Sequence, residues 1–186
     1  MFDRTELWYL KESGIAAASG TTFTVTWGGG APTDAMYAAA TYAGVEQSTP
    51  VASSNTATTS AATPNPITAT ISAEPRGYAV ASVACGNSGT YSWNNGWTLG
   101  TDQTSSATTE MSTAHIAETT STTDTASATQ SGPNRQAMVV AYLNPVFEDD
   151  MDEVSWQAVE LKDGSLVQSG SASFANGVSQ ATLATA

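Results

Sequence analysis

The chain has 186 residues, of which 40% are hydrophobic, 8% aromatic and 12% charged, and its formal net charge is −12. Five Trp, six Tyr and four Phe residues are enough to anchor a hydrophobic core, so the composition excludes an intrinsically disordered chain. The negative charge excludes nucleic acid and anionic membranes as favoured partners, because both repel an acidic surface.

Cys85 is the only cysteine of the sequence, which excludes an intrachain disulfide and a cysteine-based metal site. It lies in the apolar run AVASVACG, and this setting predicts a buried thiol that packs as a small hydrophobic side chain.

The first 65 residues hold three runs with strand-like patterns. Residues 5–10 predict a strand, and residues 21–27 alternate apolar side chains with threonines, as a half-buried strand does. Residues 34–45 share an apolar face if extended, although their alanines would also allow a helix. Residues 46–65 are rich in Ser, Thr and Ala and predict a loop.

The clearest strand signals lie in the middle of the chain. Residues 66–73 and 78–85 predict two strands joined by a turn, and residues 78–85 are apolar enough for a central strand. Within residues 91–100, the Asn95-Gly96 step accommodates positive φ and predicts a hairpin or a bulge.

Three further segments precede the acidic run. Residues 111–118 predict a strand, residues 119–132 a loop with a weak edge strand, and residues 134–145 a strong strand that Pro145 ends. The remainder predicts a β-meander of three short strands, at residues 154–161, 165–174 and 178–185.

Short strands at this spacing, with no alternating helices, predict an all-β antiparallel sandwich and disfavour a doubly wound α/β fold. The expected organisation is a β-sandwich domain at residues 1–145 and an acidic linker at residues 146–153. A C-terminal β segment at residues 154–186 would start or complete another β domain.

Six stretches carry a family resemblance: ELWYLKESG, TTFTVTWGGG, AAATYAGVEQSTPV, ITATISAEPRGYAVASVACG, TYSWNNGWTLG and RQAMVVAYLNP. Together, over residues 5–145, they resemble the jelly-roll-like β-sandwich modules of phage tail and capsid-decoration proteins and of large bacterial surface proteins. The cues are the Gly44-Val45 and Thr49-Pro50 pairs, Trp97 in a Gly-Trp step, and a closing strand that ends in Asn before Pro.

The resemblance implies a jelly-roll-like fold and a virion or surface role, and the family has no common chemistry. Family members carry two or three more strands before the one that matches residues 5–10. We therefore expect that the chain is cut at both ends, or that a neighbouring subunit or the C-terminal meander completes its sheets.

Trp93 and Trp97 flank Asn94 and Asn95, and exposed aromatic rings beside amides can stack on sugars and bind their hydroxyls. These four residues are the candidate glycan site. The alternative is that one or both indoles pack in the core.

The acidic run supplies a candidate calcium site, because calcium takes six to eight oxygen ligands. The candidate ligands are Glu148, Asp149, Asp150 and Asp152, and the alternative is a solvated linker. Calcium is the one cofactor that the sequence suggests.

An enzyme is disfavoured. His115 is the only histidine, no Gly-x-Ser-x-Gly nucleophile elbow occurs, and consecutive carboxylates converge poorly on one sugar. We read His115 as a partly exposed strand residue.

No signal peptide and no membrane-length apolar run are visible in the sequence. The favoured function is a structural, homo-oligomeric phage-particle protein that binds capsid or tail subunits. The alternative is a domain of a secreted or cell-surface adhesin that binds glycan. The expected location is therefore the virion or the cell exterior.

Overall fold

The structure is a computed structural model. It describes residues 4–20, 22, 24–26, 28, 32–105, 108–118, 122–146, 153–159 and 166–173, the last two ranges by their backbone only.

The described chain contains one short helix, α1 at Glu12–Ala17, and is otherwise built from strands. The strands are β1 (Val51–Thr59), β2 (Ile67–Ser72), β3 (Tyr78–Cys85), β4 (Tyr91–Trp93), β5 (Thr98–Ser105), β6 (Thr109–Ala117), β7 (Thr123–Gln130), β8 (Gln136–Leu143), β9 (Glu153–Val159) and β10 (Leu166–Ser173). The chain divides into two compact units, Met1–Val146 and Phe147–Ala186.

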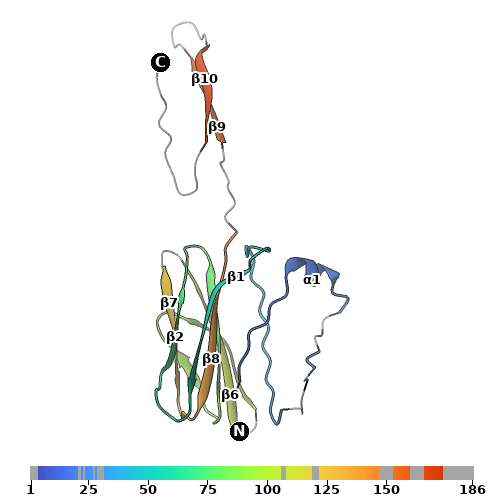
Figure 1. Ribbon diagram of the computed structural model, residues 1–186, viewed down its shortest axis with the longest axis vertical. Coiled ribbons are helices and arrows are strands. Elements are labelled where there is room, and N and C mark those ends of the chain that lie inside the picture. Colours follow the sequence, from blue (N-terminus) through green and yellow to red (C-terminus); the bar gives the residue numbers. More distant parts are fainter. Residues whose placement is uncertain are drawn as a thin grey trace. The chain divides into compact units, whose positions relative to one another are not determined.

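Two antiparallel sheets make up the first unit (Figure 1). One has five strands in the order β1-β8-β3-β6-β5, and the other has three in the order β2-β7-β4. The predicted all-β antiparallel architecture is therefore present, in a sandwich-like arrangement.

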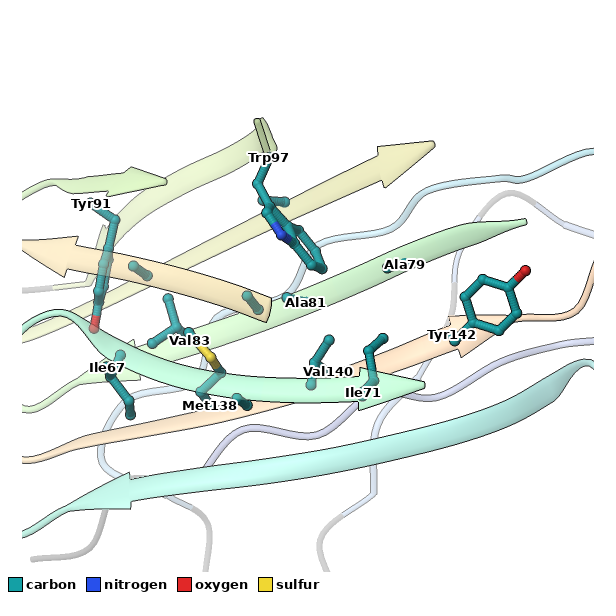
Figure 2. Packing of buried hydrophobic residues seen from close by; sticks show 14 of the residues in the cluster. Ile67, Ile71, Ala79, Ala81, Val83, Tyr91, Trp97, Met138, Val140 and Tyr142 are labelled. Carbon is teal, nitrogen blue, oxygen red and sulfur yellow. The ribbon is translucent and has the colours of Figure 1, made fainter. Parts of the chain in front are cut away.

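The core lies between the inner faces of these sheets (Figure 2). Strict alternation builds it: Ile67, Ala69 and Ile71 of β2 are buried while the residues between them are exposed. Small alanines at many inward positions leave room for larger side chains from both sheets. The large buried side chains of this cluster are Ile67, Ile71, Tyr91, Trp97, Met138 and Tyr142.

The strongest sequence predictions are confirmed. Strands β2, β3, β6 and β8 lie within a residue or two of their predicted ranges, and β3 has two hydrogen-bonded neighbours and occupies the middle of its sheet. Cys85 is 1% exposed at the end of β3, as its apolar neighbours predict.

Two predicted loops contain strands. Residues 46–65 hold β1, which pairs with β8 and packs Ala57 against the core. Residues 119–132 hold β7, which is the middle strand of its sheet rather than a weak edge. Both predictions were wrong because Ser, Thr and Ala give little hydrophobic contrast, whereas pairing and burial of alternate residues suffice for a strand.

The three predicted N-terminal strands are wrong in the described residues. Residues 4–10 and 34–44 are irregular, the described part of 21–27 has no strand, and Val45 makes only an isolated bridge with Pro145. Phe23 and Trp27 lie outside the described residues. The edge strands of the five-stranded sheet are β1 and β5, and the N-terminal segment does not pair with either. Instead it contacts outward-facing residues of β3, Thr5 at Ser82 and Tyr42 at Tyr78.

Of the two alternatives at residues 91–100, the hairpin is wrong, whereas the pairing of β5 with β6 does shift register, as at a bulge, between Leu99 and Thr101. Asn95 and Gly96 do adopt positive φ, of 58° and 82°. Their turn, however, connects β4 in one sheet with β5 in the other. It therefore carries the chain across the core.

In the second unit β9 and β10 pair in an antiparallel two-stranded sheet, which confirms two strands of the predicted meander. The third predicted strand, residues 178–185, lies outside the described residues.

Candidate functional site

The turn between β4 and β5 places both tryptophans of the predicted glycan site against the core. Trp97 is 5% exposed, and its ring stacks on that of half-buried Trp93 with centroids 5.8 Å apart and planes 25° apart. The Trp93 indole donates from Nε1 to Ser112 Oγ at 2.9 Å. Trp97 therefore offers no open ring face for a sugar, in agreement with the core-packing alternative.

Asn94 and Asn95 are exposed, but their amide nitrogens are engaged by β7. Asn94 Nδ2 donates to Ser127 Oγ at 3.1 Å and to Thr129 Oγ1 at 3.2 Å, and Asn95 Nδ2 donates to the Thr125 carbonyl at 3.2 Å. These bonds attach the turn to the three-stranded sheet. The glycan site stays a prediction, and what remains accessible for it is the exposed surface of the two asparagines.

His115 is half-buried on β6, opposite Val80 of β3 and Thr98 of β5. Its ring meets that of Tyr42 edge-on, with centroids 6.0 Å apart, and Tyr42 also packs on Tyr78 at 5.5 Å. The histidine thus helps to hold the N-terminal segment on the outer face of the five-stranded sheet.

The candidate calcium ligands Glu148, Asp149, Asp150 and Asp152 lie outside the described residues. Among the residues that are described, no three His, Cys, Asp or Glu side chains converge as a metal site would require.

A surface that the sequence reasoning did not single out is formed by residues 4–10, which we call the aromatic arm. Four consecutive large apolar residues are exposed in it: Leu7 by 38%, Trp8 by 87%, Tyr9 by 61% and Leu10 by 62%. Together these four side chains form a continuous run of exposed apolar surface along the arm.

Hydrogen bonds at the start of the arm, and at the residue that follows it, attach it to the rest of the first unit. Thr5 Oγ1 and Ser82 Oγ are hydrogen-bonded at 2.8 Å, and Lys11 Nζ donates to the Ser48 carbonyl at 3.1 Å. Between these anchors, no backbone amide or carbonyl of residues 6–10 is hydrogen-bonded within the described chain. Toward the rest of the described chain, the arm thus presents its backbone groups without hydrogen bonds, beside its exposed side chains.

The sequence also did not indicate two pairs of carboxyl groups, one near each end of β6. Residues 110, 112, 114, 116 and 118 share the inward parity of this strand, so Glu110 and Glu118 both turn toward the interior. The alternation was readable in the sequence, but a partner carboxylate for each glutamate could be found only in the structure.

At one end Glu110 is 1% exposed and lies beside Asp102 of β5. Thr104 Oγ1 donates to Glu110 Oε2 at 2.5 Å, and the Tyr91 amide donates to Asp102 Oδ2 at 3.3 Å. Burial raises the pKa of Glu110, and the charge of Asp102 raises it further.

At the other end Glu118 is 5% exposed and its carboxyl lies beside that of Asp124 of β7. Burial first, and then the hydrogen bond and charge of Asp124, raise the pKa of Glu118 to about 7. In both pairs the pKa of the glutamate is thus raised by burial and by the neighbouring aspartate.

No protein-family model matches the chain, and neither a curated protein nor a solved structure matches it. Within its described part, no helix is long and apolar enough to cross a membrane.

Proposed function

We propose that this chain is a non-catalytic structural subunit of a phage particle, a jelly-roll-like decoration or tail-associated protein that assembles through its aromatic arm. The observation that carries the proposal is the arm itself, with four consecutive exposed apolar side chains and a backbone that forms no hydrogen bond to the other described residues.

Physical chemistry supports an assembly role for such an arm. Exposed apolar patches of this kind mark interaction sites, and Trp and Tyr are the residues that most often dominate interface energetics. An extended segment with unpaired amides can also add as a strand to the sheet edge of a neighbour. The partner is therefore a sheet edge on a second copy of this chain or on another subunit of the particle.

The edge strands of the two sheets are also consistent with assembly through an added strand. In the five-stranded sheet β1 and β5 each have one hydrogen-bonded neighbour, and in the three-stranded sheet β2 and β4 do. Exposed Leu99 on β5 adds apolar surface to one of these edges. An edge of this kind can accept an additional strand.

A glycan-binding domain of a secreted or surface adhesin is the second candidate. It is favoured by the exposed Asn94 and Asn95 next to a three-stranded sheet whose outer face carries hydroxyls, including the Thr70–Thr125 pair at 2.8 Å. Such a domain would bind sugars as a monomer and would not need the arm.

The test compares the full chain with a Trp8→Ser, Tyr9→Ser double variant by sedimentation velocity and by co-sedimentation with phage particles. We expect the native chain to self-associate or to bind particles, and the double variant to do so at least about tenfold more weakly. Val146→Ser, which removes an exposed apolar side chain outside the arm and away from the strand edges, is the matched control and should keep most of the association.

A native chain that stays monomeric and binds no particle would overturn the proposal. Association that survives the double variant unchanged would overturn the role of the arm.

A further inference from the structure

Two described residues that follow β6, Glu118 and Thr122, are bonded through their backbone to the segment between β2 and β3. Glu118 N donates to the Gly77 carbonyl at 2.9 Å, and Arg76 N donates to the Glu118 carbonyl at 2.7 Å. Two further bonds tie the same end: Ala73 N to the Thr122 carbonyl at 3.0 Å, and Tyr142 Oη to the Glu74 carbonyl at 2.5 Å. The backbone of Glu118 is therefore held through both its amide and its carbonyl, and its side chain is 5% exposed.

The carboxyls of Glu118 and Asp124 leave oxygens buried without an N–H or O–H donor. Asp124 Oδ1 accepts the Thr125 amide at 2.6 Å, but Asp124 Oδ2 and Glu118 Oε1 have no donor in the described chain. A hydrogen bond between two carboxyls needs one proton, and removing that proton leaves two negative charges in contact.

The surroundings offer this pair little compensating charge. Tyr142 of β8 faces Glu118, and the turn brings the acidic Glu74 close to Tyr142. Arg76 supplies a cation from the same turn, but its side chain is exposed and forms no ion pair within the described residues. Apart from Arg76, the charged and titratable groups facing the pair are acidic.

We propose that Glu118 and Asp124 hold a single shared proton, and that this proton locks the loop after β6 to the turn between β2 and β3. When the proton leaves to solvent, the two carboxylates repel each other and water must enter to solvate them, which weakens this end of the fold. The device makes the molecule more stable in weak acid than in weak alkali, and it does not depend on the assembly role of the arm.

The sign of the effect follows from the raised pKa of Glu118. Its value of about 7 in the folded chain exceeds the ordinary 4.5, so the folded state binds the proton more tightly than the unfolded state. The stabilisation is complete below about pH 4.5 and is lost as the pH rises through about 7.

The first experiment measures the melting temperature of the full chain between about pH 5.5 and 8.5, a range chosen to cross the transition. The native protein should lose at least about 4 °C over this range. Glu118→Gln keeps an N–H donor for Asp124 without a titrating proton, so it should melt above the native chain at the alkaline end and lose less than half as much. The exposed Glu12→Gln removes the same charge and should keep the native profile.

The second experiment does not rely on a variant that folds. Carbon-13 NMR of the Glu118 side-chain carboxyl in the native chain should show a titration midpoint about 7. A midpoint at the ordinary value for glutamate, or a Glu118→Gln profile identical to the native one, would overturn the proposal.

Discussion

At the scale of single residues, the same residue type has opposite roles at different positions. Trp97 is 5% exposed in the core and Trp8 is 87% exposed on the arm. A Gly-Trp step and a Leu-Trp step do not reveal this difference. It arises because the β4–β5 turn directs Trp97 between the sheets, where it stacks on Trp93.

Replacing Trp97 by alanine is therefore expected to lower the free energy of unfolding by about 3–5 kcal/mol, because the substitution loses buried apolar contacts and also leaves a cavity in the core. The same replacement of Trp8 should change it by less than about 0.5 kcal/mol. Urea denaturation of both variants checks the prediction. Equal effects at the two positions would contradict the placement of Trp97 in the core.

At the scale of elements, close approach of the backbone decides which residue a turn can accept. Gly77 ends the turn between β2 and β3, where a Cβ atom would meet Tyr142 Oη and would lie 2.6 Å from the Leu143 carbonyl oxygen. The carbonyl belongs to β8, so the backbone itself limits how far the neighbour can yield. Glycine at this position therefore allows the backbone of the turn to lie close to the backbone of β8.

Gly77→Ala should thus destabilise the chain by about 1–3 kcal/mol, through overpacking against β8. Gly20→Ala is the matched control, because a Cβ there meets nothing within 4 Å and should change stability by less than about 0.5 kcal/mol. Thermal melting of the two variants measures both effects. A Gly77→Ala variant as stable as the control would show that the turn can relax.

At the scale of the whole molecule, stability resides in the first unit. Among the described residues, its buried core cluster runs from Ile67 to Tyr142 and includes both sheets, with Ala57 of β1 packed against it. Strands β9 and β10 form a sheet of two strands, which is marginal on its own in water.

A fragment that ends at Val146 is therefore expected to fold and to melt within about 2 °C of the full chain, since the buried core cluster lies within its own residues. Calorimetry of the fragment beside the full chain is the measurement. A fragment that melts without a cooperative transition would show that the second unit is needed to complete the first.

Sequence alone determined the central part of this fold. Period-two burial in residues 67–72 and 78–85 identifies β2 and β3, and the apolar setting of Cys85 predicts its burial. These predictions succeed because hydrophobic alternation is local and reads directly as a buried face.

Only the tertiary structure decided the rest. Strands β1 and β7 form from Ser, Thr and Ala because partners are present to pair with them, whereas residues 5–10 stay unpaired despite a better strand composition. The carboxyl pairs arise in the same way, because Glu110 and Glu118 find Asp102 and Asp124 only when β5 and β7 are in place. Pairing and proximity between distant residues are properties of the assembled sheets, and no local pattern encodes them.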